Sequence, residues 1–446
     1  MNDFHACTDA LAHPACFQDR GGPTWSVNAV SEALARARDP IVSGDALSTR
    51  GDLLGPPISQ AAILPFGMSL LMLACLLAAV LGTAMLLSRR VPGLSSQAHP
   101  RTRWLDGLRG LAVTLVMLNH APLVLQNLQL APTGFALGDD TRALLDYLGS
   151  IGVQIFFCIT GCLFARKLLP AQNVDWPLFF VRRMQRLVPA YLVAVLATIV
   201  VAALFSRIDR HFIASALEAI PRLMAFGFYP LPRVGAFETS RLLGMSWTLA
   251  FEWRFYVLLP LVFMVIRLGK APGSVAIALV TIVLMLVEGL GVWMFFALGA
   301  LASPLTRMQP TPRQFAVAQG TLCVCAASML LNWEVVDRDR VLQGLHVLAL
   351  FACAAIVRPR CLSTRSAVAL GTLSYSLYLL HVMVFFACFG LCHAYVLDVA
   401  ALSPAAFTLF ACLAVAAVMT VSTLSYLLLE RRFVDFEPKP EPRPVR

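Results

Sequence analysis

Charged side chains are scarce in this chain of 446 residues: Asp, Glu, Lys and Arg make up 13% of it, and hydrophobic residues 59%. Ordinary soluble domains carry about 25% charged residues, so the composition excludes a disordered, nucleic-acid-coating or disulfide-stapled protein. A mean hydropathy of +0.75 over this length is more than one buried core can account for. The composition therefore predicts an all-α polytopic membrane protein, a bundle of helices within the lipid bilayer.

Motifs of several enzyme classes are also missing. The sequence has no G-x-x-x-x-G-K-[ST], no G-x-G-x-x-G after a strand and no H-E-x-x-H, so nucleotide hydrolysis and zinc-dependent hydrolysis lose their usual sequence support. None of the twelve cysteines forms a C-x-x-C pair, and most lie in or beside apolar runs, where a thiol behaves as a small hydrophobe. A disulfide between Cys7 and Cys16, which lie in a polar segment, is an alternative that the sequence does not decide. We expect no bound metal ion and no permanently bound cofactor.

What is present is a series of long apolar runs. Residues 1–60 form a loose polar extension, with seven acidic and four basic residues, and residues 61–87 form an additional span. Ten further spans follow at about 106–125, 147–169, 188–205, 246–266, 274–288, 291–305, 315–332, 341–357, 366–390 and 404–429. Residues 433–446 form a tail rich in proline and charge.

The net charge of +10 is unevenly distributed along the chain. Basic residues cluster in every second connection between the ten spans, whereas the intervening connections are acidic or mixed. This alternation follows the positive-inside rule. We therefore expect a multi-pass protein of the bacterial inner membrane, with both ends of the ten-span body, including the C-terminus, in the cytoplasm and no nucleic-acid partner. The additional span would place residues 1–60 outside.

The first span carries three polar groups that are costly in lipid, Asp106, Arg109 and His120. Arg109 and His120 are eleven residues apart, which returns a helix to within about 20° of its starting direction, so both lie on one face. Their axial separation is ~16 Å, and Asp106 lies one turn before Arg109, where it can orient the guanidinium. The alternative is that Arg109 snorkels to the interface and His120 is a packing histidine.

A second constellation is G-T-L-S-Y-S-L-Y-L-L-H at residues 371–381. Ser374, Tyr378 and His381 occupy positions i, i+4 and i+7 of one helix face, with Tyr375 beside it. The alternative is an interface between helices that is rich in small and polar residues.

Two further clusters carry charge. The run S-W-T-L-A-F-E-W-R-F-Y at 246–256 contains Trp247 and places Glu252 and Tyr256 at i and i+4, and a structural charge pair is its alternative. The run R-R-M-Q-R-L-V-P-A-Y at 182–191 includes Arg183 and Arg186 at a helix entrance. Those arginines either anchor the helix at the cytoplasmic surface or bind a phosphate-bearing ligand.

A basic cytoplasmic mouth, an arginine inside it and a histidine three turns deeper suggest a channel for a long phosphorylated substrate. Coenzyme A thioesters have this shape, and a histidine can deprotonate a hydroxyl or take the acyl group itself. A secondary transporter or flippase that uses the same charges as a proton relay is the alternative. Transporters usually contain internal repeats, and neither the R-x10-H pattern nor the second constellation is duplicated.

The sequence resembles the acyltransferase 3 family of membrane O-acyltransferases. The resemblance covers residues 101–432 and rests on L-D-G-L-R-G with R-x10-H, G-V-Q-I-F-F-C-I-T-G-C-L at 152–163, the two arginines of 182–191, the runs at 246–256 and 371–381, and Glu430. It implies acyl transfer, most often of acetyl from cytoplasmic acetyl-CoA, to a hydroxyl of a cell-surface or exported carbohydrate or glycolipid.

The resemblance also implies roles for individual residues. Arg109, with Arg183 and Arg186, would hold the coenzyme A phosphates, and His120 would be the general base or a transient acyl carrier. The remaining candidates would assist catalysis or support the acceptor: Asp106, His381, Glu252, Ser374, Tyr375, Tyr378, Trp247 and Tyr256.

The two ends of the chain carry separate expectations. Some relatives have a C-terminal extracytoplasmic domain of the SGNH type that is absent from this sequence, so we expect a stand-alone membrane enzyme. Because the resemblance begins near Arg101, we expect residues 1–87 to be dispensable, and Met85 could even start a chain with a basic cytoplasmic N-terminus. The alternative is that the additional span packs against the body and its extension covers the acceptor site.

Overall fold

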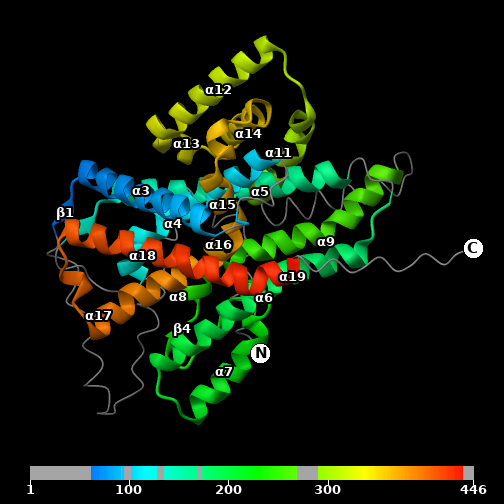
Figure 1. Cartoon of the computed structure of the whole chain (residues 1–446). Helices are drawn as coiled ribbons and strands as arrows, with labels where there is room; N and C mark the ends of the chain where they lie inside the picture. Colours follow the sequence, from blue (N-terminus) through cyan, green and yellow to red (C-terminus); the bar gives the residue numbers. More distant parts are fainter. Residues whose placement is uncertain are drawn as a thin grey trace, which may run out of the picture.

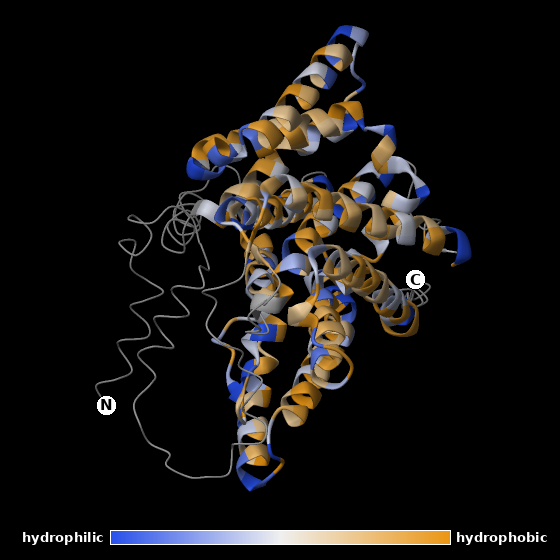
Figure 2. Ribbon diagram, turned by 90° about the vertical axis from the view of Figure 1, so that its left-hand side faces the viewer, coloured by the Kyte–Doolittle hydropathy of each residue, from blue (hydrophilic) through white to orange (hydrophobic). Residues whose placement is uncertain are grey.

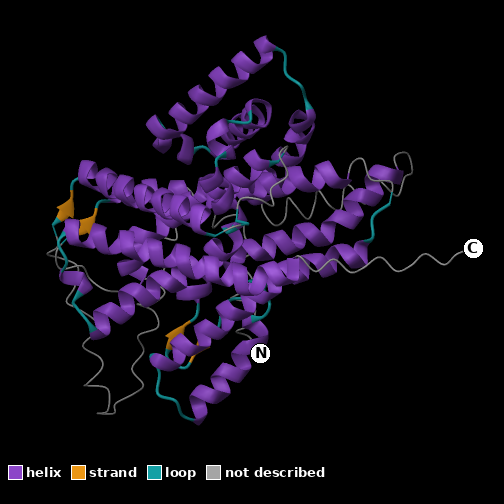
Figure 3. Ribbon diagram, in the orientation of Figure 1, coloured by secondary structure: helices purple, strands orange, loops and turns teal. Residues whose placement is uncertain are grey.

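The computed structural model describes residues 62–91, 93–94, 102–127, 135–168, 173–268 and 290–434, which form a helical bundle with two pairs of two-residue strands (Figures 1 and 3). The longer helices are α3 (Phe66–Arg90), α4 (Arg103–Asn127), α5 (Asp139–Leu168), α6 (Trp176–Leu204), α7 (Arg210–Leu223), α9 (Trp247–Leu268), α11 (Leu290–Ala302), α12 (Pro312–Leu331), α14 (Arg340–Val357), α16 (Ser374–Phe386) and α18 (Pro404–Ser425). The predicted all-α membrane bundle is confirmed.

Shorter elements connect these helices. They are β1 (Ile63–Leu64), β2 (Ala136–Leu137), β3 (Arg233–Val234), β4 (Phe237–Glu238), α8 (Ser240–Leu243), α13 (Trp333–Arg338), α15 (Arg365–Thr372), α17 (Cys392–Tyr395), α19 (Arg431–Val434), the 3₁₀ turns η3 (Gly244–Ser246), η4 (Ser303–Arg307), η5 (Arg360–Ser363) and η7 (Val399–Ala401), and the π-helical turns η6 (Ala387–Leu391) and η8 (Tyr426–Glu430). Strands β1 and β2 pair in parallel, and β3 and β4 pair antiparallel.

Eight helices among the described residues are long and apolar enough to cross a membrane. They match eight of the eleven predicted spans, and Figure 2 shows hydrophobic residues along most of the helical surface. The predicted span 341–357 is a shorter apolar helix, and 291–305 is the 13-residue helix α11. The predicted span 274–288 lies outside the described residues.

Helix α4 lies at the centre of the bundle. In an apolar stretch of 18 residues, 72% of the residues of α4 are buried, against 11% of those of α12. Helix α12 packs on α13 and α14 at the periphery (Figure 1). Glycines let α4 approach η5 and α15 closely. A Cβ at Gly107 would collide with the backbone of Leu362 in η5, and a Cβ at Gly110 would lie 2.5 Å from the carbonyl oxygen of Ala367 in α15. From the α15 side, a Cβ at Gly371 would collide with the backbone of Asp106. The glycines of the L-D-G-L-R-G motif therefore allow the packing that holds α4 in place.

The basic connections gather at one end of the bundle. The Arg307 guanidinium donates to the carbonyl of Arg166 at 2.7 Å, and that of Arg358 donates to the carbonyl of Thr306 at 2.7 Å. The start of α4 packs against η5, which belongs to the same end. This clustering is the arrangement that the positive-inside pattern predicts.

Helix α3 is packed into the body, beside α18 and α15 (Figure 1). Its side chains Met72, Leu76 and Val80 are buried, and the Thr372 hydroxyl donates to the carbonyl of Leu94 at 2.8 Å. Strand pair β1–β2 joins its start to the segment that precedes α5. This packing agrees with the alternative in which the additional span packs against the body. Whether residues 1–87 are dispensable for transfer stays a prediction.

Residues 209–243, which we name the α7–α8 segment, form an ordered unit where the sequence predicts only a connection. Asp209 caps α7 by accepting a hydrogen bond from the Phe212 amide at 2.8 Å. The Tyr191 hydroxyl of α6 donates to the carbonyl of Leu223 at 2.7 Å. The hydrophobic side of this segment packs with Leu379 and Phe386 of α16. It is therefore attached to the helix that carries the second constellation.

Candidate active site

Asp106 and Arg109 are in contact on α4, as the spacing predicts. Arg109 Nη1 lies 3.4 Å from Asp106 Oδ1, and both side chains are mostly buried. Arg186 of α6 is close enough for its charge to act on both residues. A second cation beside Arg109 makes this end of α4 strongly attractive to anions.

Helix α9 completes what we name the Arg109 cluster: Asp106, Arg109, Arg186, Glu252 and Tyr256. The Tyr256 hydroxyl donates to the Glu252 carboxylate, the i and i+4 pair predicted on this helix. Tyr256 and Glu252 also lie within electrostatic range of Arg109. Three helices that are distant in sequence therefore bring charged and polar groups to one place.

Arg183 lies in an aromatic environment. Its guanidinium carbon is 5.5 Å from the ring centre of Phe164, 5.8 Å from that of Phe179 and 6.0 Å from that of Tyr256. Its buried Nε has no hydrogen-bond partner among the described residues. Tyr256 is thus the residue that links Arg183 to the Arg109 cluster.

The start of α16 lies beside the Arg109 cluster, since the charges of Glu252 and Arg186 act on Tyr375. The Tyr375 hydroxyl donates to the carbonyl of Leu187 at 2.7 Å, one residue beyond Arg186. Ser376, which the sequence analysis did not select, donates to the buried carboxylate of Glu430. Ser374 is buried at the first residue of α16.

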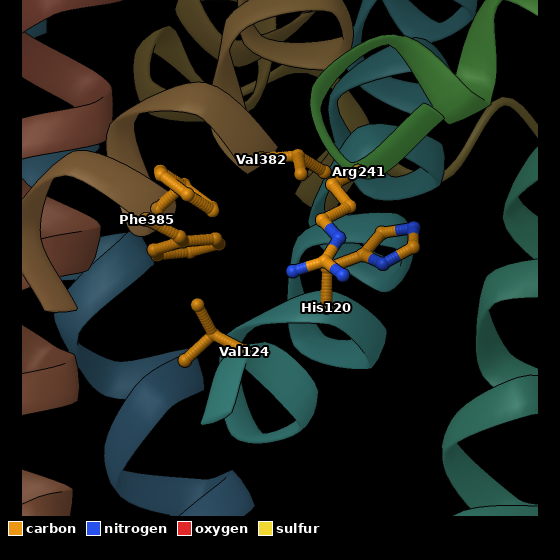
Figure 4. A pocket seen from close by; sticks show the side chains of 6 residues that line it. His120, Val124, Arg241, Val382 and Phe385 are labelled. Atoms are coloured by element: carbon orange, nitrogen blue, oxygen red, sulfur yellow. The ribbon is translucent and has the colours of Figure 1, made fainter. Parts of the chain in front are cut away.

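His120 and His381 meet at the other end of the candidate site. Their ring centres lie 5.0 Å apart at an interplanar angle of 50°. His120 lines a cavity of about 10 Å³, close to the room one water molecule needs. The cavity, which we name the His120 cavity, is shown in Figure 4 and is lined by His120, Val124, Arg241, Val382, Phe385 and Phe386.

The tautomer of His381 follows from its hydrogen bond. His381 Nδ1 lies 3.0 Å from the carbonyl oxygen of Leu377, and because a carbonyl can only accept, Nδ1 carries the proton. In the neutral ring Nε2 is then an acceptor, and it is buried without a partner among the described residues. His381 therefore presents an available nitrogen lone pair next to His120.

Tyr378 lies between the two ends of the site. Its hydroxyl is 2.9 Å from Thr248 Oγ1, and its ring centre is 6.1 Å from that of His381. The charge of Glu252 also acts on it. Tyr378 and His381, which the sequence places on one helix face, are thus neighbours in the site.

The candidate Trp247 packs along its own helix. Trp247 is 37% exposed at the first residue of α9 and packs edge-on against Phe251. No ring contact among the described residues joins Trp247 to either of the two histidines.

Arg241 is a lining residue that sequence reasoning missed. It lies in the short helix α8, outside every predicted span, and neither periodicity nor a motif distinguishes it. Its proximity to His120 arises because the α7–α8 segment folds back on α16, and this packing has no local sequence signal.

Comparison with known families matches residues 102–426 to the model of the acyltransferase domain Acyl_transf_3. The chain belongs to the acyltransferase 3 family. Every residue of the Arg109 cluster and of the His120 cavity lies within the match. The matching model is described as an acyltransferase domain.

Similar curated proteins cover different shares of this acyltransferase 3 chain. YrhL of Bacillus subtilis (strain 168) is 33% identical over 175 residues, 37% of this chain and 24% of YrhL. Peptidoglycan O-acetyltransferase OatA of Listeria monocytogenes is 28% identical over 163 residues, 35% of this chain and 23% of that protein. O-acetyltransferase OatA of Staphylococcus aureus (strain NCTC 8325) is 26% identical over 319 residues, 62% of this chain and 49% of that protein.

The chain thus matches from about a quarter to about half of the length of these relatives. No solved structure matches it significantly. Within the described residues, no group of three or more His, Cys, Asp or Glu is placed to hold a metal ion.

Proposed function

We propose that this acyltransferase transfers an acetyl group from acetyl-CoA to a hydroxyl of a cell-surface carbohydrate. The observation that carries the proposal is the arrangement along α4, with a cationic cluster around Arg109 near its start and a histidine pair at His120 near its end. The O-acetyltransferase names of two relatives support the class of reaction. The family match favours acyl transfer over the transporter alternative.

In this proposal the donor binds at the Arg109 cluster. A guanidinium fork matches the oxygen atoms of a phosphate, and Asp106 holds the fork of Arg109 in one orientation. Arg186 adds a second positive charge at the same place. Coenzyme A is long enough to reach from this cluster toward His120, about 16 Å farther along the helix.

His120 takes the proton of the acceptor hydroxyl. His381 Nε2, the available acceptor next to His120, then receives a hydrogen bond from the imidazolium that forms. This is how the orienting group of a catalytic triad supports its base. The hydroxyl oxygen attacks the thioester carbonyl, and the proton held by His120 passes to the departing thiolate.

The direction of transfer follows from the same arrangement. The basic connections lie at the end of the bundle where α4 begins, so we place the Arg109 cluster toward the cytoplasm and the C-terminus on that side of the inner membrane. The acceptor, a carbohydrate or glycolipid, then approaches His120 from the opposite end.

The test measures two products from purified protein in lipid nanodiscs supplied with radiolabelled acetyl-CoA. We expect release of free thiol and, with solubilised peptidoglycan fragments as the acceptor probe, labelled ester. His120→Ala should abolish ester formation, whereas His346→Ala, a change at a histidine that contacts Ser328 in the peripheral helices, should not. Absence of thiol release and ester from the wild-type protein, for this acceptor and for the organism's own surface glycan, would refute the proposal.

A further inference from the structure

Arg241 brings a guanidinium group to the His120 cavity from outside the long helices. Figure 4 shows its guanidinium beside the His120 imidazole, with Val124 and Phe385 across the space. The cavity has one cation, Arg241, and one base, His120, among its lining residues within the described part of the chain. A cation and a base that share so small a space will both contact a group that reacts there.

Glu238 orients the Arg241 side chain. Glu238 Oε2 lies 3.7 Å from Arg241 Nε, so the two terminal nitrogens extend beyond this contact toward the cavity (Figure 4). Glu238 also contacts Arg233, whose side chain is 66% exposed, against 26% for Arg241. The two arginines thus share one carboxylate, yet Arg241 alone of the two lines the cavity.

The backbone around Arg241 is held firmly against α16. Leu242 and Leu243, which follow Arg241, are fully buried in a core that includes Leu379 and Phe386. Thr239 Oγ1 donates to the carbonyl of Pro232 at 2.5 Å and closes the β3–β4 hairpin. Arg241 is therefore positioned on the same rigid unit as His381, and little reorganisation is needed for it to act.

The walls of the cavity make this cation effective. Val124, Val382, Phe385 and Phe386 are apolar, and charges interact more strongly in such surroundings than in water. When a hydroxyl attacks a thioester, negative charge develops on the carbonyl oxygen within a few ångströms of the base that removes the hydroxyl proton. The Arg241 guanidinium lies beside this base, His120, in the apolar cavity (Figure 4).

We propose that the guanidinium of Arg241 stabilises the acyl carbonyl oxygen of the tetrahedral intermediate, a role that rests on the transfer reaction proposed above. The acceptor oxygen bonds to the carbonyl carbon, its proton moves to His120, and the carbonyl electron pair moves to the oxygen that faces Arg241. Collapse restores the carbonyl, breaks the carbon–sulfur bond and returns the proton to the thiolate. The products are the ester and free coenzyme A.

The experiment compares Arg241→Gln with Arg233→Gln, a matched change at the other arginine that contacts Glu238. Both variants are measured for acetyl-CoA hydrolysis, in which water replaces the acceptor, and for transfer to the carbohydrate probe. Because the oxyanion forms in both reactions, we expect Arg241→Gln to lower kcat of each about 10²-fold, with KM for acetyl-CoA within about twofold of the wild type. Arg233→Gln should keep wild-type kinetics.

Two further variants guard against a folding defect. Arg241→Lys keeps the charge but lacks the fork, so we expect an intermediate kcat at an unchanged melting temperature. In Arg241→Ala, added guanidinium ion should restore part of kcat, and it should not change kcat of Arg233→Ala. A role in structure alone would give no such rescue.

Three outcomes overturn the proposal. One is that Arg241→Gln has the same kcat as Arg233→Gln. If Arg241→Gln does not accumulate, Arg241→Lys takes its place in this comparison. Another is unchanged hydrolysis with a raised KM for the carbohydrate, which would make Arg241 an acceptor-binding residue. Inactive wild-type protein would overturn the proposed function together with this role, whereas active wild-type protein with an unaffected Arg241→Gln variant overturns this role only.

Discussion

His120 of α4 and His381 of α16 face each other with ring centres 5.0 Å apart, and the Nδ1–H of His381 is directed to the carbonyl of Leu377. The second ring therefore has one nitrogen fixed by the backbone and one available to its neighbour. Two histidines arranged in this way should act as a unit, in which the loss of either disables the other.

A double-mutant cycle tests that unit. We expect His120→Asn and His381→Asn each to lower kcat of transfer by about 10²–10⁴-fold. The double variant should be little worse than the more damaging single variant, because residues of one catalytic unit are not additive. Steady-state kinetics at matched amounts of folded protein measure the effect. Independent contributions, seen as multiplied losses in the double variant, would contradict the pairing.

Arg109→Lys should impair use of the donor. The lysine ammonium is a point charge that cannot make the two parallel bonds of a guanidinium fork, and it would also loosen the contact with Asp106. We expect a KM for acetyl-CoA raised by about tenfold, a loss of one charge-assisted hydrogen bond. Arg338→Lys is the control, since Arg338 is 82% exposed and pairs only loosely with Glu334. If the two variants had the same KM for acetyl-CoA, Arg109 would be an anchor at the membrane interface and would not bind the donor.

Gly371→Ala should destabilise the bundle. The added Cβ would collide with the backbone of Asp106, and backbone atoms cannot move aside as the end of a flexible side chain can. We expect the free energy of unfolding to fall by about 1–3 kcal/mol and the melting temperature in nanodiscs to fall with it. Gly320→Ala, in α12, meets no atom within 4 Å and should be neutral or slightly stabilising. Equal melting temperatures for the two variants would show that the close approach of α4 and α15 is unimportant.

Removal of α3 tests the two expectations for the N-terminal region. A chain that begins at Met85 lacks the side chains of Met72, Leu76 and Val80 that pack in the body, so we expect lower thermal stability and poorer accumulation. A chain that begins at residue 62 behind a new methionine keeps all of α3 and should be as stable as the full chain. Should the Met85 chain match it in stability and in transfer, the expectation of dispensability would hold instead.

Part of this structure is predictable from local sequence. Hydropathy identifies the long helices because the bilayer demands about 20 apolar residues, and helical geometry puts Asp106 beside Arg109 and Tyr378 near His381. The span predicted at 366–390 is instead divided at Leu373 between α15 and α16. Apolar residues such as Leu370, Leu373 and Leu377 stand on both sides of this point, so hydropathy alone does not reveal the break.

The rest depends on tertiary packing. Helix α6 begins at Trp176, ahead of its predicted start at 188. The predicted start is too late because the arginines of 182–191 mark a change in composition. The helix nevertheless continues through them and through Pro189. The meeting of His120 with His381 and the entry of Arg241 into their cavity each need segments that are far apart in sequence. A single sequence contains no signal for such contacts.

The contrast between α4 and α12 has a consequence for the membrane in which the protein works. Cell membranes differ in thickness, and helices in contact with lipid adjust by tilting. Helix α12, with 11% of its apolar stretch buried, is free to make this adjustment. Helix α4, with 72% of its apolar stretch buried, is shielded by its neighbours. A thicker or thinner bilayer should therefore shift the peripheral helices and leave the spacing between Arg109 and His120 unaltered, so that the candidate site would keep its geometry in membranes of different lipid content.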